Sequence, residues 1–273
     1  MRELVLGGAG LIGAELVRSL QRRGHVVQSL DLKTGCDLRD VRPEAFDSYD
    51  RVWFLAWDAG GAKYLGASSA QHQMYKTSSE LAARVFSILA ETRQPFLFVT
   101  SQLAGQPHAY GLTKLMAEHW AAALRGKRAR LWNVYGWEPP SEKSHVITDL
   151  VLSGLVDGRV RCLTRGQERR RFLYKTDGAD ALMALFESPE DAADFAGPEW
   201  LTIGAVAGEV ARQIGVQLEL GTADATEVMV DPQKPLPGWQ PRVSLGEGIA
   251  RVIEEARAFL RGQDRTTGTE AVK

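Results

Sequence analysis

The sequence is poor in cysteine, and this already limits the kind of protein it encodes. Its 273 residues include two cysteines, Cys36 and Cys162, which are far apart in the chain and form no CxxC pair. Small secreted domains that depend on disulfides carry many more, so a disulfide scaffold is excluded. We expect a reduced, cytoplasmic setting in which both thiols are small buried hydrophobic groups.

Net charge is nearly absent. The 33 basic and 34 acidic residues leave a formal charge of −1, whereas a protein that mainly binds nucleic acid usually carries a basic excess. We therefore expect no nucleic-acid partner. The five histidines show no spacing of the HExxH kind, so no metal site is expected.

Long apolar runs are missing as well. The stretch Val52–Trp57 is among the longest, and it is far shorter than the ~20 residues that span a bilayer. The run Leu4–Leu6 near the first residue is too short for a secretory signal, so no membrane partner is expected. Apolar residues still make up 44% of the chain, which is enough for one large or two small folded domains.

The first half of the sequence alternates short apolar runs with helical patterns. Strands are expected at residues 3–6, 25–31, 51–55, 96–100 and 129–132. Helices are expected between them at residues 11–22, 73–92 and 110–124. Strands that are apolar throughout and alternate with helices form a parallel sheet covered on both faces, so the expected fold class is α/β with a doubly wound parallel sheet.

The pattern breaks after Gly136, where Glu138–Ser141 predicts a turn or linker. A smaller mixed region is expected to follow, with helices at 145–155, 179–186 and 245–260 and strands at 160–163, 172–174 and 200–203. Residues 263–273 are polar and aperiodic, and we expect them to form a flexible tail.

A glycine-rich turn follows the first expected strand and opens the first expected helix. Its glycines stand at Gly7, Gly10 and Gly13, and Asp31 ends the second strand. Glycines allow a tight turn and the close approach of a pyrophosphate, which the helix N-terminus attracts. Asp31 is placed to accept hydrogen bonds from an adenosine ribose, and because its charge repels a 2′-phosphate it favours NAD over NADP. Lys33 nearby weakens that preference.

Further cofactor contacts are expected around this turn and at the ends of the next strands. Asp37 is a candidate for the adenine amino group, with a solvated loop acid as the equal alternative. The remaining candidate contacts are Leu11, Ile12, Leu32, Leu38, Leu55, Ala56 and Trp57. The loop after the third strand lines the crevice of an open α/β sheet, which is why Ala56 and Trp57 are expected beside the cofactor.

Several motifs, in order, resemble the extended short-chain dehydrogenase/reductase superfamily in its NAD-dependent nucleotide-sugar epimerase/dehydratase branch. They are the glycine turn, the Tyr-x-x-x-Lys of Tyr110–Lys114, and the segments Arg130–Gly136, Arg170–Tyr174 with Asp177, Trp200–Gly204 and Gly238–Pro241. The resemblance spans residues 3–260. It implies a Rossmann-type NAD domain at 1–136 to which 171–204 returns, and a smaller C-terminal α/β substrate lobe at 137–170 and 205–262.

The resemblance implies that Tyr110 and Lys114 are catalytic and also contact NAD. Four residues apart on a helix, they share one face, and a nearby ammonium lowers the pKa of a phenol. The tyrosine then takes a proton from a sugar hydroxyl. A hydroxyl after the fourth strand is expected to share the substrate oxygen with the tyrosine. The strand pattern favours Ser101 and the following Leu103–Gly105 favours Thr100, so both stay candidates. His108, just before Tyr110, is a candidate contact of the active site, with a solvent-facing cap as the favoured alternative.

Two departures from the family bear on the reaction. The loop before Tyr110 is short, which implies an open or partner-completed site. Gln102 stands where dehydratases and decarboxylases of the family carry an acid, and elimination needs a general acid and base there. A third departure is Met74–Thr77, which lacks the family's usual Asn-Val-x-Gly-Thr and leaves its cofactor contacts open.

The substrate candidates are Lys63, Gln102, Asn133 and Arg170, the last for a diphosphate. Arg171 replaces the family's acid. The leading hypothesis is a nucleotide-sugar 4-epimerase that uses tightly bound NAD. A keto-reductase or dehydrogenase, or a dehydratase, is the alternative, and a non-catalytic dinucleotide sensor comes last. By resemblance, the helices at 73–92 and 110–124 are expected to pair across a homodimer axis.

Overall fold

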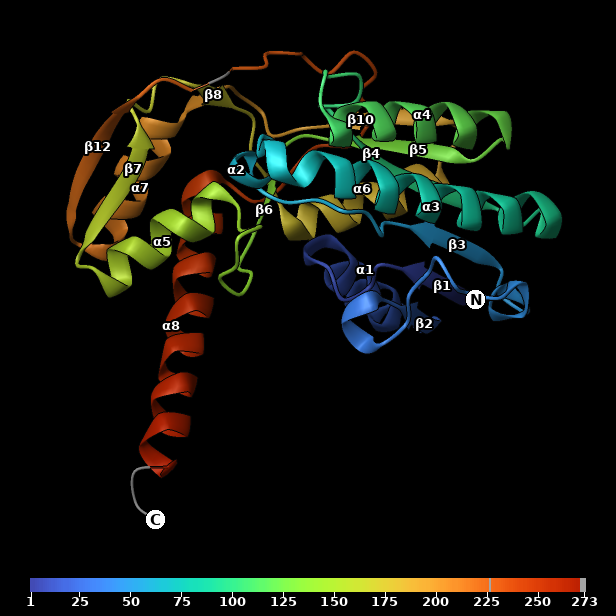
Figure 1. Ribbon diagram of the computed structural model, residues 1–273, viewed down its shortest axis with the longest axis horizontal. Coiled ribbons are helices and arrows are strands. Elements are labelled where there is room, and N and C mark those ends of the chain that lie inside the picture. Colours follow the sequence, from blue (N-terminus) through green and yellow to red (C-terminus); the bar gives the residue numbers. More distant parts are fainter. Residues whose placement is uncertain (226, 271–273) are drawn as a thin grey trace.

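A six-stranded parallel sheet forms the centre of the molecule (Figure 1). The computed structural model describes residues 1–225 and 227–270, with the helical backbone alone for 263–270. The strand order is β2-β1-β3-β4-β5-β10. The strands are β1 (Arg2–Leu6), β2 (Val26–Leu30), β3 (Arg51–Phe54), β4 (Phe96–Ser101), β5 (Lys127–Leu131) and β10 (Ala192–Phe195). The order reverses between β1 and β3, so the predicted doubly wound, Rossmann-type sheet is confirmed.

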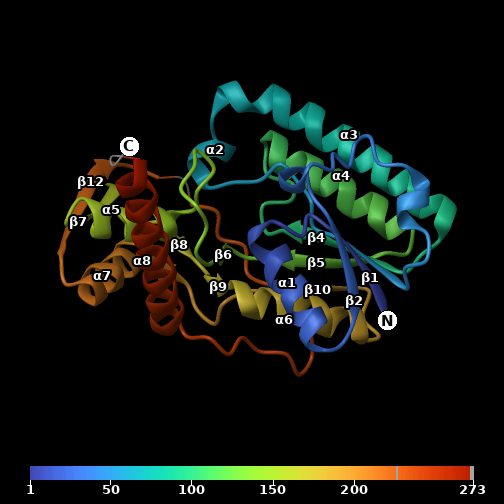
Figure 2. The same cartoon turned by 90° about the horizontal axis from the view of Figure 1, so that it is seen from below.

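Helices cover both faces of this sheet, as Figure 2 shows from below. One face carries α1 (Leu11–Arg22) and α6 (Lys175–Glu187), and the other carries α3 (Ser68–Thr92) and α4 (Ala109–Ala123). Alternate strand residues supply the two cores: Trp53 packs on the first side and Phe54 on the second. Between β3 and α3 lies the short α2 (Ala62–Leu65), and single 3-10 turns lie at Leu32–Thr34 and Pro43–Phe46.

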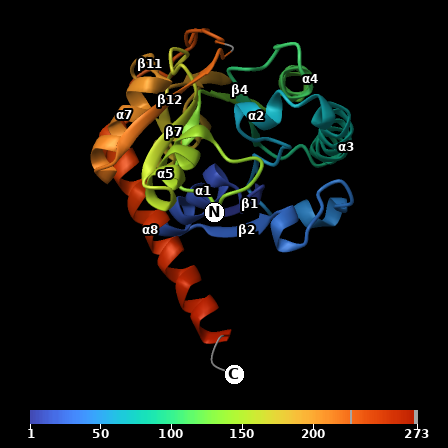
Figure 3. The same cartoon turned by 60° about the vertical axis from the view of Figure 1, so that its left-hand side comes forward.

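The smaller lobe has a third core of its own. It contains α5 (Val146–Val156), β7 (Arg159–Thr164), α7 (Ile203–Ile214), β12 (Gln217–Ala223) and α8 (Leu245–Glu270). β7 and β12 pair in parallel. Two short pairs connect the lobe to the sheet, β6 (Val134–Tyr135) with β9 (Leu173–Tyr174) and β8 (Arg169–Arg170) with β11 (Leu201–Thr202). Figure 3 shows α8 extending away from the body.

The chain after β12 crosses back to the large sheet. The Asp194 carboxylate on β10 accepts the backbone N–H groups of Gln233 and Lys234 at 2.7 and 3.0 Å. Trp239 packs edge-on against Phe195 and donates its Nε1–H to Asp180 at 3.2 Å. Part of the segment 205–262, expected to belong to the lobe, therefore lies on the cofactor domain.

Local differences from the expected elements have simple causes. Ile203, expected to end a strand, begins α7, because Thr202 caps that helix by accepting the Ala205 N–H at 3.2 Å. α3 begins at Ser68, five residues before the expected start at 73. The expected tail at 263–273 lies where the structure describes no side chains, and residues 271–273 lie outside the described residues. In the described part of the chain, no helix is long and apolar enough to cross a bilayer.

The buried carboxylate of Glu3, on β1, gives a first prediction. Glu3 is fully buried; its Oε1 lies 2.8 Å from His25 Nδ1, and its Oε2 accepts the Trp53 Nε1–H at 2.9 Å. Glu3→Ala leaves both partners without their acceptor, so we expect the free energy of unfolding in urea to fall by about 2–4 kcal/mol. Glu3→Gln keeps an acceptor and is expected to lose less than half of that. A loss below ~0.5 kcal/mol for Glu3→Ala contradicts the prediction.

Candidate active site

The glycine turn is shaped by backbone contacts that leave no room for side chains. Gly7 has a φ of +91°, and a Cβ there would lie 2.5 Å from the Ala56 nitrogen. A Cβ on Gly13 would lie 2.1 Å from the Gly7 carbonyl oxygen. Gly10 is the N-cap residue of α1, so the N–H groups of Leu11 and Ile12 begin the helix at the turn. This cradle fits a pyrophosphate.

Asp31 is held rigidly beside the cradle. Its Oδ2 accepts the Ala9 N–H at 2.9 Å and its Oδ1 accepts the Lys33 N–H at 2.8 Å, while the side chain is buried. Lys33 Nζ reaches the Ala9 carbonyl at 3.5 Å. The fixed carboxylate and the glycine cradle together fit the adenosine ribose and pyrophosphate of NAD, which these residues would hold.

The other residues predicted around the adenosine lie in mixed surroundings. The Arg39 guanidinium contacts both carboxylate oxygens of Asp37 and lowers the pKa of that carboxyl. Leu32 is exposed, whereas Leu38 is buried in the core on the α3 and α4 side of the sheet. Leu38 thus has only its backbone to offer a ligand.

The end of β3 meets the glycine turn directly. The N–H groups of Leu55 and Ala56 both donate to the Leu6 carbonyl, at 2.9 and 2.8 Å. Trp57 turns its ring toward Phe98, with ring centroids 5.5 Å apart. Its Nε1–H is buried and has no hydrogen-bond partner in the described part of the chain, so a donor remains available at this strand end.

Lys114 is buried beneath Tyr110 on α4. Its Nζ donates to the Val99 carbonyl at 2.6 Å and lies 4.3 Å from the centroid of the Trp57 ring and 5.9 Å from that of Tyr110. Burial lowers the pKa of Lys114 well below its usual value, and the nearby Glu118 carboxylate opposes the shift.

The tyrosine pKa shifts opposite to the expected direction. The sequence predicts that the ammonium lowers the pKa of Tyr110; instead, burial raises it, and a hydrogen bond with the Ser101 hydroxyl opposes that rise. The shift runs opposite to the expected direction because removing the phenolate from water outweighs the effect of the Ser101 hydroxyl.

The two candidate hydroxyls lie on opposite sides of β4, as the alternation of a strand requires. The Ser101 hydroxyl interacts with the Tyr110 phenol and acts to lower its pKa, and the Ser101 Oγ accepts the Leu103 N–H at 3.2 Å. Thr100 instead donates to Glu118 Oε2 at 3.0 Å, and the same carboxylate accepts from Arg130 at 2.6 Å. The structure brings Ser101 and Tyr110 together and turns Thr100 away from them.

Gln102 lies directly after Ser101 with an unusual environment. Its backbone N–H donates to the Leu131 carbonyl at 3.1 Å, and its side chain is buried. The Oε1 atom has no hydrogen-bond partner among the described residues. Because a buried polar atom without a partner is costly, this carboxamide is a candidate ligand contact.

The remaining substrate candidates are spread over both domains. Asn133, at φ +23° between β5 and β6, donates from Nδ2 to the Arg171 carbonyl at 3.3 Å. Lys63 is exposed on α2 and acts electrostatically on Asp149 of α5 in the lobe. These two side chains lie where the lobe and the cofactor domain meet.

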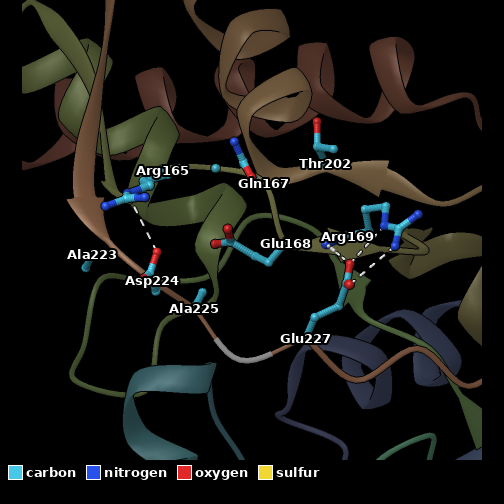
Figure 4. Close-up of a pocket in the computed structure, with 10 residues that line it drawn as sticks. Arg165, Gln167, Glu168, Arg169, Thr202, Ala223, Asp224, Ala225 and Glu227 are labelled. Atoms are coloured by element: carbon cyan, nitrogen blue, oxygen red, sulfur yellow. Dashed lines mark hydrogen bonds and ion pairs between the residues drawn. The ribbon is translucent and has the colours of Figure 1, made fainter.

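The arginine-rich segment borders a cavity of about 670 Å³ (Figure 4). Arg165 and Arg169 line it and pair with Asp224 at 3.6 Å and Glu227 at 2.9 Å. Arg170 donates to the Arg169 carbonyl at 2.7 Å, and burial lowers its pKa. Arg171, in place of an acid, donates to the carbonyls of Gly197 and Pro198 at 2.8 Å each, which is a structural role.

Sequence reasoning missed two side chains near Tyr110, those of Gln71 and Glu118. Gln71 on α3 accepts the Ala109 N–H at 2.8 Å, and Glu118 joins Thr100 to Arg130. His108 is the predicted cap, and it also stacks on the Tyr110 ring. The spacing of Glu118, four residues after Lys114, was a usable signal for that carboxylate, whereas Gln71 lies too far away in sequence to have been found.

Within the described residues, no group of three or more His, Cys, Asp or Glu could hold a metal ion.

Comparison with known proteins identifies the family. Residues 3–196 match the NAD dependent epimerase/dehydratase family. UDP-glucuronic acid decarboxylase 1 of Xenopus tropicalis is 23% identical over 320 residues, which cover 96% of this chain and 73% of that protein.

Two solved structures show the same fold. UDP-glucose 4-epimerase from Thermotoga maritima has a TM-score of 0.80 at 20% identity, covering 95% of this chain and 100% of the other. UDP-glucuronic acid 4-epimerase from Bacillus cereus, in complex with UDP-glucuronic acid and NAD, has a TM-score of 0.79 at 18% identity, with the same coverage of 95% and 100%. The predicted family resemblance is confirmed. The chain belongs to the NAD-dependent epimerase/dehydratase family and is an NAD-dependent enzyme of that family.

Proposed function

We propose that the protein is a nucleotide-sugar 4-epimerase that oxidises and then re-reduces C4 of the sugar. The observation that carries this proposal is the Ser101 hydroxyl close enough to the Tyr110 phenol to lower its pKa, with Gln102 directly after it. The pair supplies proton transfer at a carbinol, and Gln102 offers an amide where elimination across C5 and C6 needs an acid.

NAD, when bound, would accept a hydride from C4 of the sugar and later return it to C4. Tyr110 removes the proton of the C4 hydroxyl, and Ser101 holds the same oxygen by a hydrogen bond. Lys114 is fixed close to the phenol by its hydrogen bond to the Val99 carbonyl and by the Trp57 ring. The keto sugar then rotates so that its opposite face meets the cofactor. Tyr110 returns the proton to the C4 oxygen as the epimer forms.

The substrate side follows from the charged groups near the lobe. We assign Arg170 to the diphosphate, since a planar guanidinium matches phosphate oxygens, and Asn133 and Lys63 to the sugar nucleotide. Gln102 contacts the sugar with its Oε1, which has no partner among the described residues and accepts a hydrogen bond from a sugar hydroxyl. The glycine turn, Asp31 and the strand end at Leu55–Trp57 hold NAD.

An assay with candidate sugar nucleotides tests the reaction. The purified protein is analysed by mass spectrometry for co-purified NAD and then incubated with UDP-glucose and with UDP-glucuronic acid. An epimerase forms the C4 epimer without change at the reduced-nicotinamide absorbance band. Stoichiometric formation or loss of that band supports the keto-reductase or dehydrogenase alternative, and release of CO₂ or water supports a decarboxylase or dehydratase. Absence of turnover with every sugar nucleotide supports the non-catalytic sensor.

We also propose that the protein is a cytoplasmic homodimer. Three apolar side chains are exposed on the neighbouring helices α3 and α4: Tyr75 at 39%, Leu112 at 42% and Met116 at 39%. Both cysteines are free thiols, which supports a reducing compartment. Light scattering coupled to size-exclusion chromatography tests the dimer, and a mass near 30 kDa at micromolar concentration contradicts it.

A further inference from the structure

His108 connects the first turn of α4 with the tyrosine ring. It is the N-cap residue of the helix, with φ −141° and ψ 164°, and its Nδ1 accepts the Gly111 N–H at 3.1 Å. Its imidazole lies nearly parallel to the Tyr110 ring, at 22° with ring centroids 6.3 Å apart. The His108 side chain thus contacts both the first turn of α4 and Tyr110, the residue proposed to transfer the proton.

The first N–H groups of a helix have no partner within the helix, and here side chains accept two of them. The loop before the helix packs so closely that a Cβ on Gly111 would lie 2.6 Å from the Leu103 carbonyl oxygen. From the other side, Gln71 Oε1 accepts the Ala109 N–H, and its Nε2 donates to the Leu65 carbonyl at 2.9 Å. Tyr110 therefore lies between two residues whose backbone N–H groups are capped by side chains.

An imidazole differs from the usual caps because it titrates near neutral pH. Ser, Thr, Asn and Asp caps remain acceptors at pH 5–8, whereas a protonated histidine carries N–H donors on both ring nitrogens. The observed hydrogen bond requires a neutral ring with an unprotonated Nδ1. Protonation would set a donor against the Gly111 N–H and break the cap.

The surroundings of His108 contain few other groups that titrate. Its titratable neighbour on α4 is Tyr110, the α3 side chain bonded to the adjacent Ala109 N–H is the neutral Gln71, and the loop at 102–107 holds no charged residue. Burial alone lowers the pKa of His108, with no contribution from a charged side chain of the described residues. The neutral, capping form therefore persists at neutral pH and is lost on acidification.

We propose that His108 is a positioning residue for Tyr110, and that its protonation releases the first turn of α4 and lowers turnover. This inference rests on the proposed function for its effect on turnover, but the structural part stands on the cap alone. The folded-state pKa of His108 lies below the ordinary histidine value of ~6.5. The cap is therefore fully formed above pH ~6.5. It is lost as the pH falls through the folded-state pKa.

The structural part is tested by NMR on the full chain with NAD. The histidine Cε1–H signals and the Gly111 amide are followed from pH 8 to 5, with His108→Asn used to assign the imidazole. We expect the Gly111 amide to shift with the same midpoint as His108, below ~6.5. A His108 midpoint at or above ~6.5, or a Gly111 amide that does not respond, overturns the proposal.

The functional part is tested by pH profiles of kcat. Wild type is expected to lose activity at the His108 midpoint; the pKa of Tyr110 is raised, so its ionisation lies on the alkaline side. His108→Asn keeps an acceptor that does not titrate, so its kcat at pH 7.5 stays within about twofold and its acid limb disappears. His108→Ala loses the cap and falls about five- to tenfold at all pH values.

An unchanged acid limb in His108→Asn overturns the functional part even if His108→Ala fails to fold. If no sugar nucleotide is turned over, the proposed function fails, while the NMR titration still decides whether His108 caps the helix.

Discussion

Tyr110→Phe is expected to lower kcat by at least ~100-fold, since it removes the group that takes the C4 hydroxyl proton. The ring remains, so its packing against His108 and over Lys114 is retained and the Tm is expected to stay within a few degrees. The measurement is steady-state turnover of the sugar nucleotide together with NAD content.

Two hydroxyl variants serve as matched controls for this prediction. Ser101→Ala removes the hydroxyl that interacts with the Tyr110 phenol and is expected to lower kcat by about 10- to 100-fold. Thr100→Val removes the hydroxyl that is bonded to Glu118 and is expected to lower kcat by less than about threefold. A Tyr110→Phe enzyme within tenfold of wild type, or a larger loss for Thr100→Val than for Ser101→Ala, contradicts the assignment.

Gly13→Ala is expected to weaken NAD binding by about 30- to 100-fold, which corresponds to an overpacking penalty of about 2–3 kcal/mol. The added Cβ would lie 2.1 Å from the Gly7 oxygen and 2.9 Å from the Gly8 Cα. Both are backbone atoms of the turn, so the cradle itself has to open. Calorimetry of NAD binding to cofactor-stripped protein gives the affinity, and thermal melting without NAD reports any loss of fold.

The control is Gly208→Ala in the middle of α7. A Cβ there meets no atom within 4 Å, and alanine favours a helix, so NAD affinity should not change and stability should rise slightly. If Gly13→Ala binds NAD as wild type does, the turn is not the pyrophosphate site.

The fold was predictable where local pattern determines it. The strands around Leu4, Val52 and Phe98 are apolar on both faces, so their burial in a parallel sheet follows from sequence. The return of the chain to the sheet was not predictable, because it depends on distant contacts such as Asp194 with Lys234 and Trp239 with Phe195. No local pattern encodes contacts across 40 residues or more.

The candidate site was predictable to a similar degree. The glycine spacing and the four-residue step from Tyr110 to Lys114 identified the turn and the helix face. The direction of the tyrosine pKa was not predictable, because it depends on burial created by the packed chain. The choice between Thr100 and Ser101 needed the register of β4 against α4, in which Thr100 bonds to Glu118.

Retention of a hydrogen isotope at C4 tests the proposed reaction most directly. A nucleotide sugar carrying deuterium at C4 is converted in ordinary water, and both epimers are analysed by NMR and mass spectrometry. Because the hydride that leaves C4 returns to C4, we predict that both epimers keep the deuterium at C4. Epimers in which hydrogen from water has replaced the label at C4 would contradict transient oxidation by bound NAD.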